Sequence, residues 1–145
     1  MNKAHNYFMQ QAILLAQKAE AQGEVPVGAL IVKDNEIVGE GFNQPIQSHD
    51  PTAHAEIIAL INAAKNTQNY RLMGTTLYVT LEPCLMCVGA MQHARIEALV
   101  FGATDPKLGY FSKNSGAQGN LRVTGGICET DCSALLKAFF QQRRV

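Results

Sequence analysis

Long apolar runs are absent from the 145-residue sequence. A helix that crosses a bilayer needs about 20 consecutive apolar residues, and no segment approaches that length. The first six residues are polar and lead into an amphipathic pattern, so the sequence does not indicate a secretory signal. Without export, we expect the four cysteines to be reduced thiols or metal ligands rather than disulfides. The expected location is the cytoplasm, with no membrane partner.

The sequence also lacks an excess of charge of either sign. Twelve basic residues balance twelve acidic ones, which argues mildly against a protein that grips nucleic acid by bulk charge. A local basic patch stays possible, and Arg143 and Arg144 form a small one. Hydrophobic residues make up 47% of the chain and charged residues 17%, which excludes a disordered or collagen-like chain. Because no repeat, low-complexity tract or linker is visible, residues 1–145 are predicted to form a single domain.

The hydrophobic periodicity predicts strands and helices that alternate along the chain. The expected helices cover residues 6–22, 53–67, 83–94 and 129–143, and the expected strands cover 25–33, 36–43, 75–81 and 98–103. The first two strands are expected to form an antiparallel hairpin, whereas the second half favours parallel strands with crossover helices. Residues 104–122 lack periodicity and are predicted to be a functional loop. These elements predict an α/β fold with three α/β/α layers around a mixed, mostly five-stranded sheet.

Two short motifs carry the chemistry that the sequence predicts. His54-Ala55-Glu56 is followed by Pro83-Cys84-Leu85-Met86-Cys87. One imidazole and two thiolates can occupy three of the four positions around a zinc ion, and an open fourth position is typical of a catalytic site. A carboxylate close to the histidine could accept a proton from water in that position. The sequence therefore predicts one Zn²⁺ held by His54, Cys84 and Cys87, with Glu56 as the catalytic residue.

This assignment carries a geometric condition. Cys84 and Cys87 are one helical turn apart, so their sulfur atoms face the same way, and the start of a helix favours thiolate over thiol. Glu56 follows His54 by two residues, which on a regular helix would place the two side chains on nearly opposite sides. His54 must therefore lie at the entry of its helix, where the chain is not yet regular.

A CxxC pair alone is about as typical of a structural zinc site or a redox pair as it is of a catalytic zinc site. A structural site would need a fourth ligand, which Cys128 or Cys132 could supply, although their small apolar neighbours favour core packing. The additional HxE motif and the proline before Cys84 favour the catalytic interpretation. The remaining histidines lack matched partners and are expected to be surface or hydrogen-bonded residues: His5, His49 and His93.

Several segments resemble bacterial tRNA-specific adenosine deaminases. They are residues 25–29, 43–46, 49–56, 81–87 and 100–103. The zinc motif alone is a known signature of the wider cytidine deaminase-like superfamily, and the Asn-x-Pro-Ile and Asp-Pro-Thr-Ala-His-Ala-Glu segments narrow the resemblance. It implies a cytidine deaminase-like fold and hydrolytic conversion of the wobble adenosine in a tRNA anticodon loop to inosine, with release of ammonia. It also implies a homodimer that holds the anticodon stem-loop.

The resemblance further implies a set of RNA contacts. Asn43 would hydrogen-bond the flipped base, and the backbone of Ala55 would add a contact. Asp105 would accept a hydrogen bond from a ribose 2′-hydroxyl, and Lys107 would meet a phosphate. Two residues of the last helix would lie near the loop: Arg143 and Arg144. The simpler alternatives are a turn cap, an Asp-Pro turn and a solvated helix end.

The segment after Lys107 departs from the family pattern, because Tyr110 and Phe111 stand where small residues are usual. Either ring could act as a lid or as a base-stacking platform. The main alternative function is therefore a small-molecule nucleobase or nucleoside deaminase acting on guanine, cytosine or cytidine. A non-catalytic deaminase-like RNA-binding subunit is disfavoured, because Glu56 is present.

Overall fold

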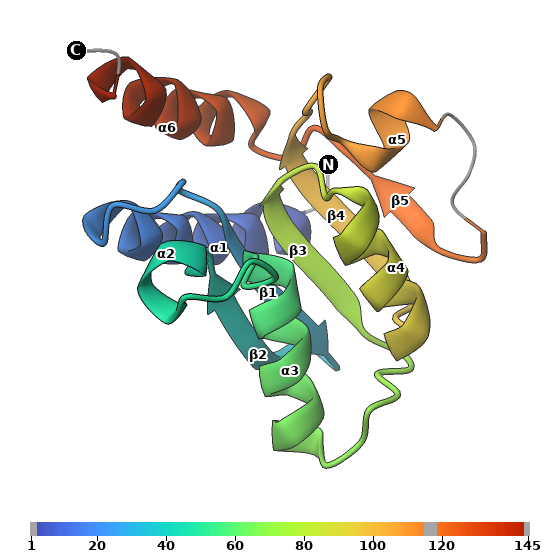
Figure 1. Cartoon of the computed structure of the whole chain (residues 1–145). Helices are drawn as coiled ribbons and strands as arrows, with labels where there is room; N and C mark the ends of the chain where they lie inside the picture. The colour runs from blue at the N-terminus through green and yellow to red at the C-terminus, as the bar shows by residue number, and fades with distance from the viewer. Residues whose placement is uncertain (1–2, 115–118, 144–145) are drawn as a thin grey trace.

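The computed structural model describes residues 3–114 and 119–143, which are arranged around one five-stranded sheet (Figure 1). The strands are β1 (Gly28–Lys33), β2 (Glu36–Phe42), β3 (Thr76–Leu81), β4 (Ala98–Ala103) and β5 (Arg122–Thr124). The helices are α1 (Lys3–Ala21), α2 (Pro45–Ser48), α3 (Ala55–Thr67), α4 (Leu85–Ala94), α5 (Tyr110–Lys113) and α6 (Glu129–Gln142). No helix of these residues is both long and apolar enough to cross a membrane.

The sheet is mixed, with the strand order β2-β1-β3-β4-β5. β1 pairs with β2 and with β3 in antiparallel fashion, whereas β3 with β4 and β4 with β5 are parallel. The predicted hairpin and the predicted parallel second half are both confirmed. Parallel neighbours place the carboxyl ends of β3 and β4 at the same edge of the sheet, and the segments that follow these strands meet there.

Helices cover both faces of the sheet and create two hydrophobic layers. Figure 1 shows α3 and α4 on one face of the sheet and α1 on the opposite face. Side chains alternate along β1, so that Ile31 packs into the layer under α3 and α4, while Leu30 packs into the layer that contains α1. Both side chains are fully buried, and each such burial contributes about 1.5–3 kcal/mol. Cys132 of α6 joins the second layer. The predicted three-layer α/β/α arrangement is therefore confirmed.

Glycines in β2 allow α3 to lie directly on the strand. A Cβ atom at Gly41 would collide with the carbonyl oxygen of Ala55 and would lie 2.6 Å from the amide nitrogen of Ala59. At Gly39 it would lie 2.5 Å from the amide nitrogen of Ala63. The close approach that these glycines permit fixes the height of α3 above the sheet and, with it, the position of the residues at the start of α3.

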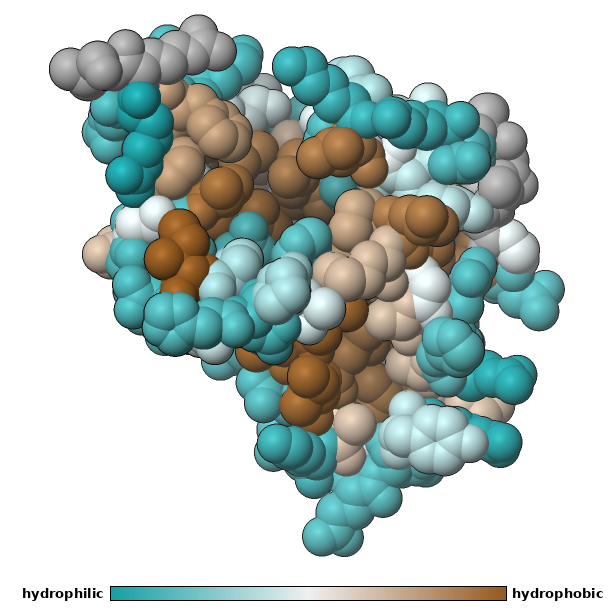
Figure 2. Space-filling model, in the orientation of Figure 1, coloured by the Kyte–Doolittle hydropathy of each residue, from teal (hydrophilic) through white to brown (hydrophobic). Residues whose placement is uncertain are grey.

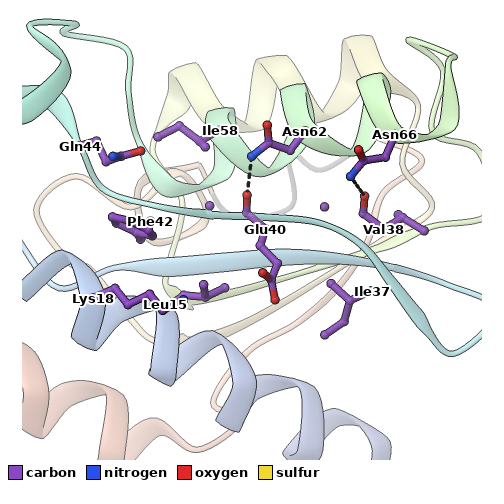
Figure 3. Close-up of a pocket in the computed structure, with 12 residues that line it drawn as sticks. Leu15, Lys18, Ile37, Val38, Glu40, Phe42, Gln44, Ile58, Asn62 and Asn66 are labelled. Carbon is purple, nitrogen blue, oxygen red and sulfur yellow. Dashed lines mark hydrogen bonds between the residues drawn. The ribbon is translucent and has the colours of Figure 1, made fainter.

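The open edge of β2 is capped by side chains of α3 (Figure 3). Asn62 Nδ2 donates to the carbonyl of Glu40, and Asn66 Nδ2 donates to the carbonyl of Val38, both at 2.8 Å. These bonds occupy carbonyl groups that another strand would otherwise pair with. A cavity of about 540 Å³ lies along this edge, and none of the residues that line it carries the predicted zinc chemistry.

Element boundaries differ from the predictions where the backbone makes a turn. β1 begins at Gly28 rather than at residue 25, because Pro26 has no N–H to donate and Val27 N bonds to Val25 O at 2.8 Å. The expected loop after β2 contains the short helix α2, and the expected loop of residues 104–122 contains α5 and the first residue of β5.

Candidate metal centre

Three side chains that could hold a metal ion meet at the starts of α3 and α4. Figure 1 shows that both helices begin at the same end of the sheet. His54 Nδ1 lies 3.7 Å from Cys84 Sγ and 3.5 Å from Cys87 Sγ. The two sulfur atoms are 3.8 Å apart. Within residues 3–114 and 119–143, no other three His, Cys, Asp or Glu side chains bring their ligand atoms this close together. The structure thus brings together the three residues that the sequence predicted as zinc ligands.

The spacing of these three atoms fits a tetrahedral zinc ion. With Zn–S bonds of about 2.3 Å and a Zn–N bond of about 2.0–2.1 Å, tetrahedral angles separate two sulfurs by about 3.8 Å and a sulfur from a nitrogen by about 3.6 Å. The observed separations of 3.8 Å, 3.7 Å and 3.5 Å agree with these values. A His-Cys-Cys set also leaves one tetrahedral position for a non-protein ligand, as in catalytic zinc sites.

His54 and Cys84 each occupy the residue immediately before a helix. Their backbones are extended, with φ −73° and ψ 154° at His54 and φ −82° and ψ 174° at Cys84. Their carbonyls accept the first helical hydrogen bonds, from Ile58 N at 3.1 Å and from Val88 N at 3.0 Å. The condition that His54 lies at the helix entry is confirmed. α4 begins two residues later than predicted, and Cys84 precedes its first turn.

The two thiols share their protons unequally. Hydrogen bonding with Cys87 and with His54 lowers the pKa of Cys84 to about 4, which favours the thiolate form of this sulfur. The same hydrogen bond to Cys84, together with burial, raises the pKa of the Cys87 thiol. The pKa of His54 is raised by its hydrogen bond with Cys84. A divalent cation among the three atoms would replace the shared protons, because metal ligands must be deprotonated.

Glu56 lies beside the three candidate ligands and is only 4% exposed. Burial raises the pKa of this carboxyl group to about 7, although a hydrogen bond from its own backbone amide and the charge of His54 act in the opposite direction. A carboxyl group with a pKa near neutrality can accept a proton and return it at physiological pH. The extended backbone at His54 explains how two residues so close in sequence can serve the same centre.

Asn43 follows β2 and lies against the start of α3. Its side-chain oxygen accepts a hydrogen bond of 2.9 Å from the backbone amide of Ala55. The Asn43 backbone amide donates to Val27 O at 3.1 Å, which fixes the chain at this point. Within the described part of the chain, the Asn43 side-chain NH₂ group has no hydrogen-bond partner, so it can donate to another molecule.

Sequence reasoning missed two buried carboxylates that hold the segments on either side of the metal centre. Glu24 accepts hydrogen bonds from Ile46 N at 3.3 Å and from Gln47 N at 2.8 Å, which fixes α2 after Asn43. Glu82 accepts one from Asp105 N at 2.9 Å, on the other side of the centre. In the sequence each is a single acidic residue followed by a run of mostly apolar residues, which is a weak signal.

The predicted RNA-contacting residues after β4 form a compact turn. The Asp105 carboxylate accepts hydrogen bonds from Lys107 N at 3.2 Å and Leu108 N at 3.1 Å, so the expected Asp-Pro turn is present. Phe111 stacks on Phe101 with a centroid separation of 6.3 Å and an interplanar angle of 2°. This packing argues against a movable lid at Phe111, whose ring instead anchors the segment.

Arg143 lies at the end of α6, next to the end of α1. Its guanidinium donates to Gly23 O at 3.1 Å and stacks over the Phe139 ring, 4.6 Å from the centroid. Neither of these two contacts of Arg143 is with a residue of the candidate metal centre. Arg144 lies outside the described residues.

The other cysteines and histidines behave as the sequence predicted. Cys132 is buried in the hydrophobic layer between α6 and the sheet, and Cys128 is half-buried next to it, so both lie outside the group that could hold a metal ion. His5 hydrogen-bonds the Tyr78 hydroxyl at 2.7 Å. The remaining two are exposed: His49 and His93.

Comparison with known proteins agrees with this geometry. Residues 2–103 match the family described as the cytidine and deoxycytidylate deaminase zinc-binding region. The tRNA-specific adenosine deaminase of Haemophilus influenzae is 55% identical over 143 residues, covering 94% of this chain and 83% of that protein. The chain belongs to the tRNA-specific adenosine deaminase family. It is therefore a zinc-dependent hydrolytic deaminase by family, as the resemblance predicted.

Two solved structures show how far the likeness to deaminases extends. One comes from a study of A-to-I editing by tRNA:A34 deaminases at the wobble position of transfer RNA. It matches with a TM-score of 0.84 and 36% identity, covering 90% of this deaminase and 99% of that chain. The guanine deaminase of Bacillus subtilis matches with a TM-score of 0.66 and 36% identity, covering 83% of this deaminase and 73% of that chain. The cytidine deaminase-like fold is thus confirmed.

Proposed function

We propose that this deaminase converts the wobble adenosine of a tRNA anticodon to inosine, with His54, Cys84 and Cys87 as ligands of one zinc ion per subunit and Glu56 as the catalytic residue. The observation that carries the proposal is the tetrahedral spacing of the three ligand atoms with a buried carboxyl group beside them. The net reaction consumes one water: a C6–O bond forms, the C6–N bond breaks, and ammonia leaves.

The residues of the chain divide this chemistry between them. When bound, zinc supplies a Lewis acid that makes water a competent nucleophile at neutral pH. Glu56 takes one proton from the attacking water and passes it to a ring nitrogen of adenine. It then takes the second proton from the hydroxyl group formed at C6 and gives it to the leaving amine, so that both protons of the water are accounted for. Its pKa of about 7, raised by burial, suits a group that must accept and donate in one cycle. Glu56 is buried near the starts of α3 and α4, which shields these proton transfers from bulk water.

We assign recognition of the flipped base to Asn43 and Ala55. The Ala55 amide holds the Asn43 oxygen at 2.9 Å, which orients the side-chain amide and leaves its NH₂ group as a donor for a ring nitrogen. The backbone amide of Ala55 would add a second contact by sharing its N–H between the Asn43 oxygen and the base. Both groups lie at the helix entry that also places His54, so the base would be held in a fixed position relative to the metal.

We assign contacts with the anticodon loop to residues on both sides of the centre. The turn after β4 would place the Asp105 carboxylate against a ribose 2′-hydroxyl, a contact that distinguishes RNA from DNA. Lys107 is exposed on the same turn and would meet a phosphate. Arg143 at the end of α6, and Arg144 next to it in the sequence, would add local positive charge to a chain whose net charge is zero.

We propose that the active form is a homodimer of one deaminase domain per chain, residues 1–145, in the cytoplasm. Support comes from apolar side chains that gather over α3 and α4 on the face seen in Figure 2. At the start of α4, Leu85 is 70% exposed and Met86 is also exposed. Ile61 of α3 is exposed as well. A second copy that covers this face would bury these side chains next to the metal centre, where both subunits could hold the RNA.

The substrate is tested by incubating the purified protein with total tRNA and, separately, with guanine, cytosine, cytidine and adenosine. Ammonia release and inosine formation are then measured. We expect inosine at the wobble position of tRNA and no product from the small molecules. Ammonia from guanine with none from tRNA would overturn the substrate proposal and favour the activity that the Bacillus subtilis relative represents.

A further inference from the structure

Glu82 is a buried carboxylate that takes no part in the proposed chemistry. It lies between β3 and Cys84 and is 3% exposed. A carboxylate this deeply buried persists only where hydrogen bonds compensate for the loss of water. The bonds that compensate Glu82 all come from one segment, residues 105–112.

Glu82 binds both ends of this segment. Its Oε1 atom accepts hydrogen bonds from Asp105 N at 2.9 Å and from the Ser112 hydroxyl at 2.6 Å. Its Oε2 atom accepts a hydrogen bond from Ser112 N at 2.7 Å. Bonds to an ionised acceptor are roughly twice as strong as bonds between neutral groups. One side chain therefore closes the segment into a loop.

The middle of the segment lies directly on the chain that leads into Cys84. A Cβ atom at Gly109 would collide with the Glu82 carboxylate, so glycine is needed for this approach. Tyr110 N donates to Pro83 O at 2.9 Å, one residue before Cys84. Figure 1 shows the resulting arrangement, with α5 beside the beginning of α4.

The inner and outer sides of the segment differ. On the inner side Glu82 makes its bonds, and the Phe111 ring stacks on Phe101. On the outer side Lys107 and Leu108 are exposed. The segment therefore presents a fixed outer surface next to the metal centre, and Glu82 is the polar anchor that fixes it.

We propose that Glu82 is a positioning residue, which holds residues 105–112 as a wall that binds the anticodon stem-loop. This inference rests on the proposed function, because it requires an RNA substrate. Glu82 acts through Asp105 and Lys107 and does not touch the reacting atoms. Its loss should weaken binding of the stem-loop and leave both the metal centre and the chemical step in place.

The test compares Glu82→Gln and Ser112→Ala with Glu97→Gln, a control that removes an exposed carboxylate whose one ion pair within the described residues is with Arg122. KM and kcat are measured with an anticodon stem-loop RNA, its Kd is measured by fluorescence anisotropy, and zinc content and the absorption spectrum of the Co²⁺-substituted protein report on the cysteine ligands. Ser112→Ala removes one bond only and covers the case in which Glu82→Gln does not fold.

We expect Glu82→Gln to raise KM and Kd by about tenfold, the effect of one lost charge-assisted hydrogen bond, with kcat within about threefold of the wild type. Ser112→Ala should raise both less, while Glu97→Gln, the zinc content and the Co²⁺ spectrum should not change. Unchanged KM and Kd in both variants would overturn the proposal, as would a fall in kcat with an altered Co²⁺ spectrum. A wild-type protein that binds the stem-loop without forming inosine would contradict the proposed function alone.

Discussion

The side-chain oxygen of Asn43 accepts a hydrogen bond of 2.9 Å from the backbone amide of Ala55. This bond joins the chain after β2 to the first residue of α3, and it satisfies a helix-terminal N–H that has no partner within the helix. A residue that we assign to base recognition thus also supports the helix entry that places His54. The two roles can be separated, because the oxygen serves the helix and the NH₂ group is available to substrate.

Asn43→Asp separates these roles. An aspartate keeps the acceptor for Ala55 N and is favourable at a helix N-terminus, but it cannot donate to a ring nitrogen. We expect stability close to that of the wild type and a fall in kcat/KM for tRNA of about tenfold or more, the effect of one lost hydrogen bond in the transition state. Urea denaturation and the rate of inosine formation measure the two effects. Asn43→Ala, the matched variant without an acceptor, should also lose about 1 kcal/mol of stability.

Cys87→Ser should lose zinc, whereas Cys132→Ser should keep it. Both cysteines are buried, but only Cys87 lies within the metal-binding group. A serine hydroxyl at position 87 does not ionise to replace a thiolate, while a hydroxyl at position 132 places a polar group in the hydrophobic layer and costs about 1–3 kcal/mol of stability. Metal analysis of the two purified variants distinguishes them. Equal zinc content in both would show that Cys87 is not a ligand.

Gly41→Ala should destabilise the protein and displace the start of α3. The added methyl group would collide with Ala55 O and approach Ala59 N to 2.6 Å, and neither backbone atom can move alone. Overpacking of this kind costs about 1–3 kcal/mol. Glu40→Ala, the next residue on the same strand with an exposed side chain, is the control and should change the free energy of unfolding by less than about 0.5 kcal/mol. Equal effects in denaturant titrations would contradict the close-packing argument.

Leu85→Lys should convert the proposed dimer to a monomer. Leu85 is 70% exposed on α4, and a charge there would have to be buried without a partner if a second copy covers this face. Leu14→Lys is the control, because Leu14 is 53% exposed on α1 in the opposite layer. Sedimentation analysis of both variants at equal zinc content gives the molecular masses. A Leu85→Lys protein that remains a dimer would move the interface elsewhere.

Much of the metal centre could be predicted because its determinants are local. The CxxC spacing fixes the relative positions of Cys84 and Cys87, and the two-residue spacing of His54 and Glu56 has one solution, an extended residue before a helix. The alternation of strands and helices along the chain likewise predicted a sheet covered on both faces, and β1 is buried on both. Short-range geometry of this kind leaves few alternatives.

The buried anchors could not be predicted because their partners are distant in sequence. Glu82 bonds to Ser112 across 30 residues, and Glu24 bonds to Ile46 across 22 residues. A single glutamate in an apolar stretch does not reveal whether it is buried or which backbone amides it accepts from. For the same reason the sequence did not show that Phe111 would be used in packing against Phe101.

The central claim is that Glu56 carries the proton in a zinc-dependent deamination of tRNA. It is tested most directly by counting inosine in tRNA, by mass spectrometry of the digested nucleosides, after incubation with wild-type and Glu56→Ala proteins of equal zinc content. General acid–base catalysis contributes about 10²–10⁴ in rate, so we expect inosine formation by the Glu56→Ala protein to fall by at least about a hundredfold while zinc is retained. Inosine formation at the wild-type rate by the zinc-loaded variant would contradict the account.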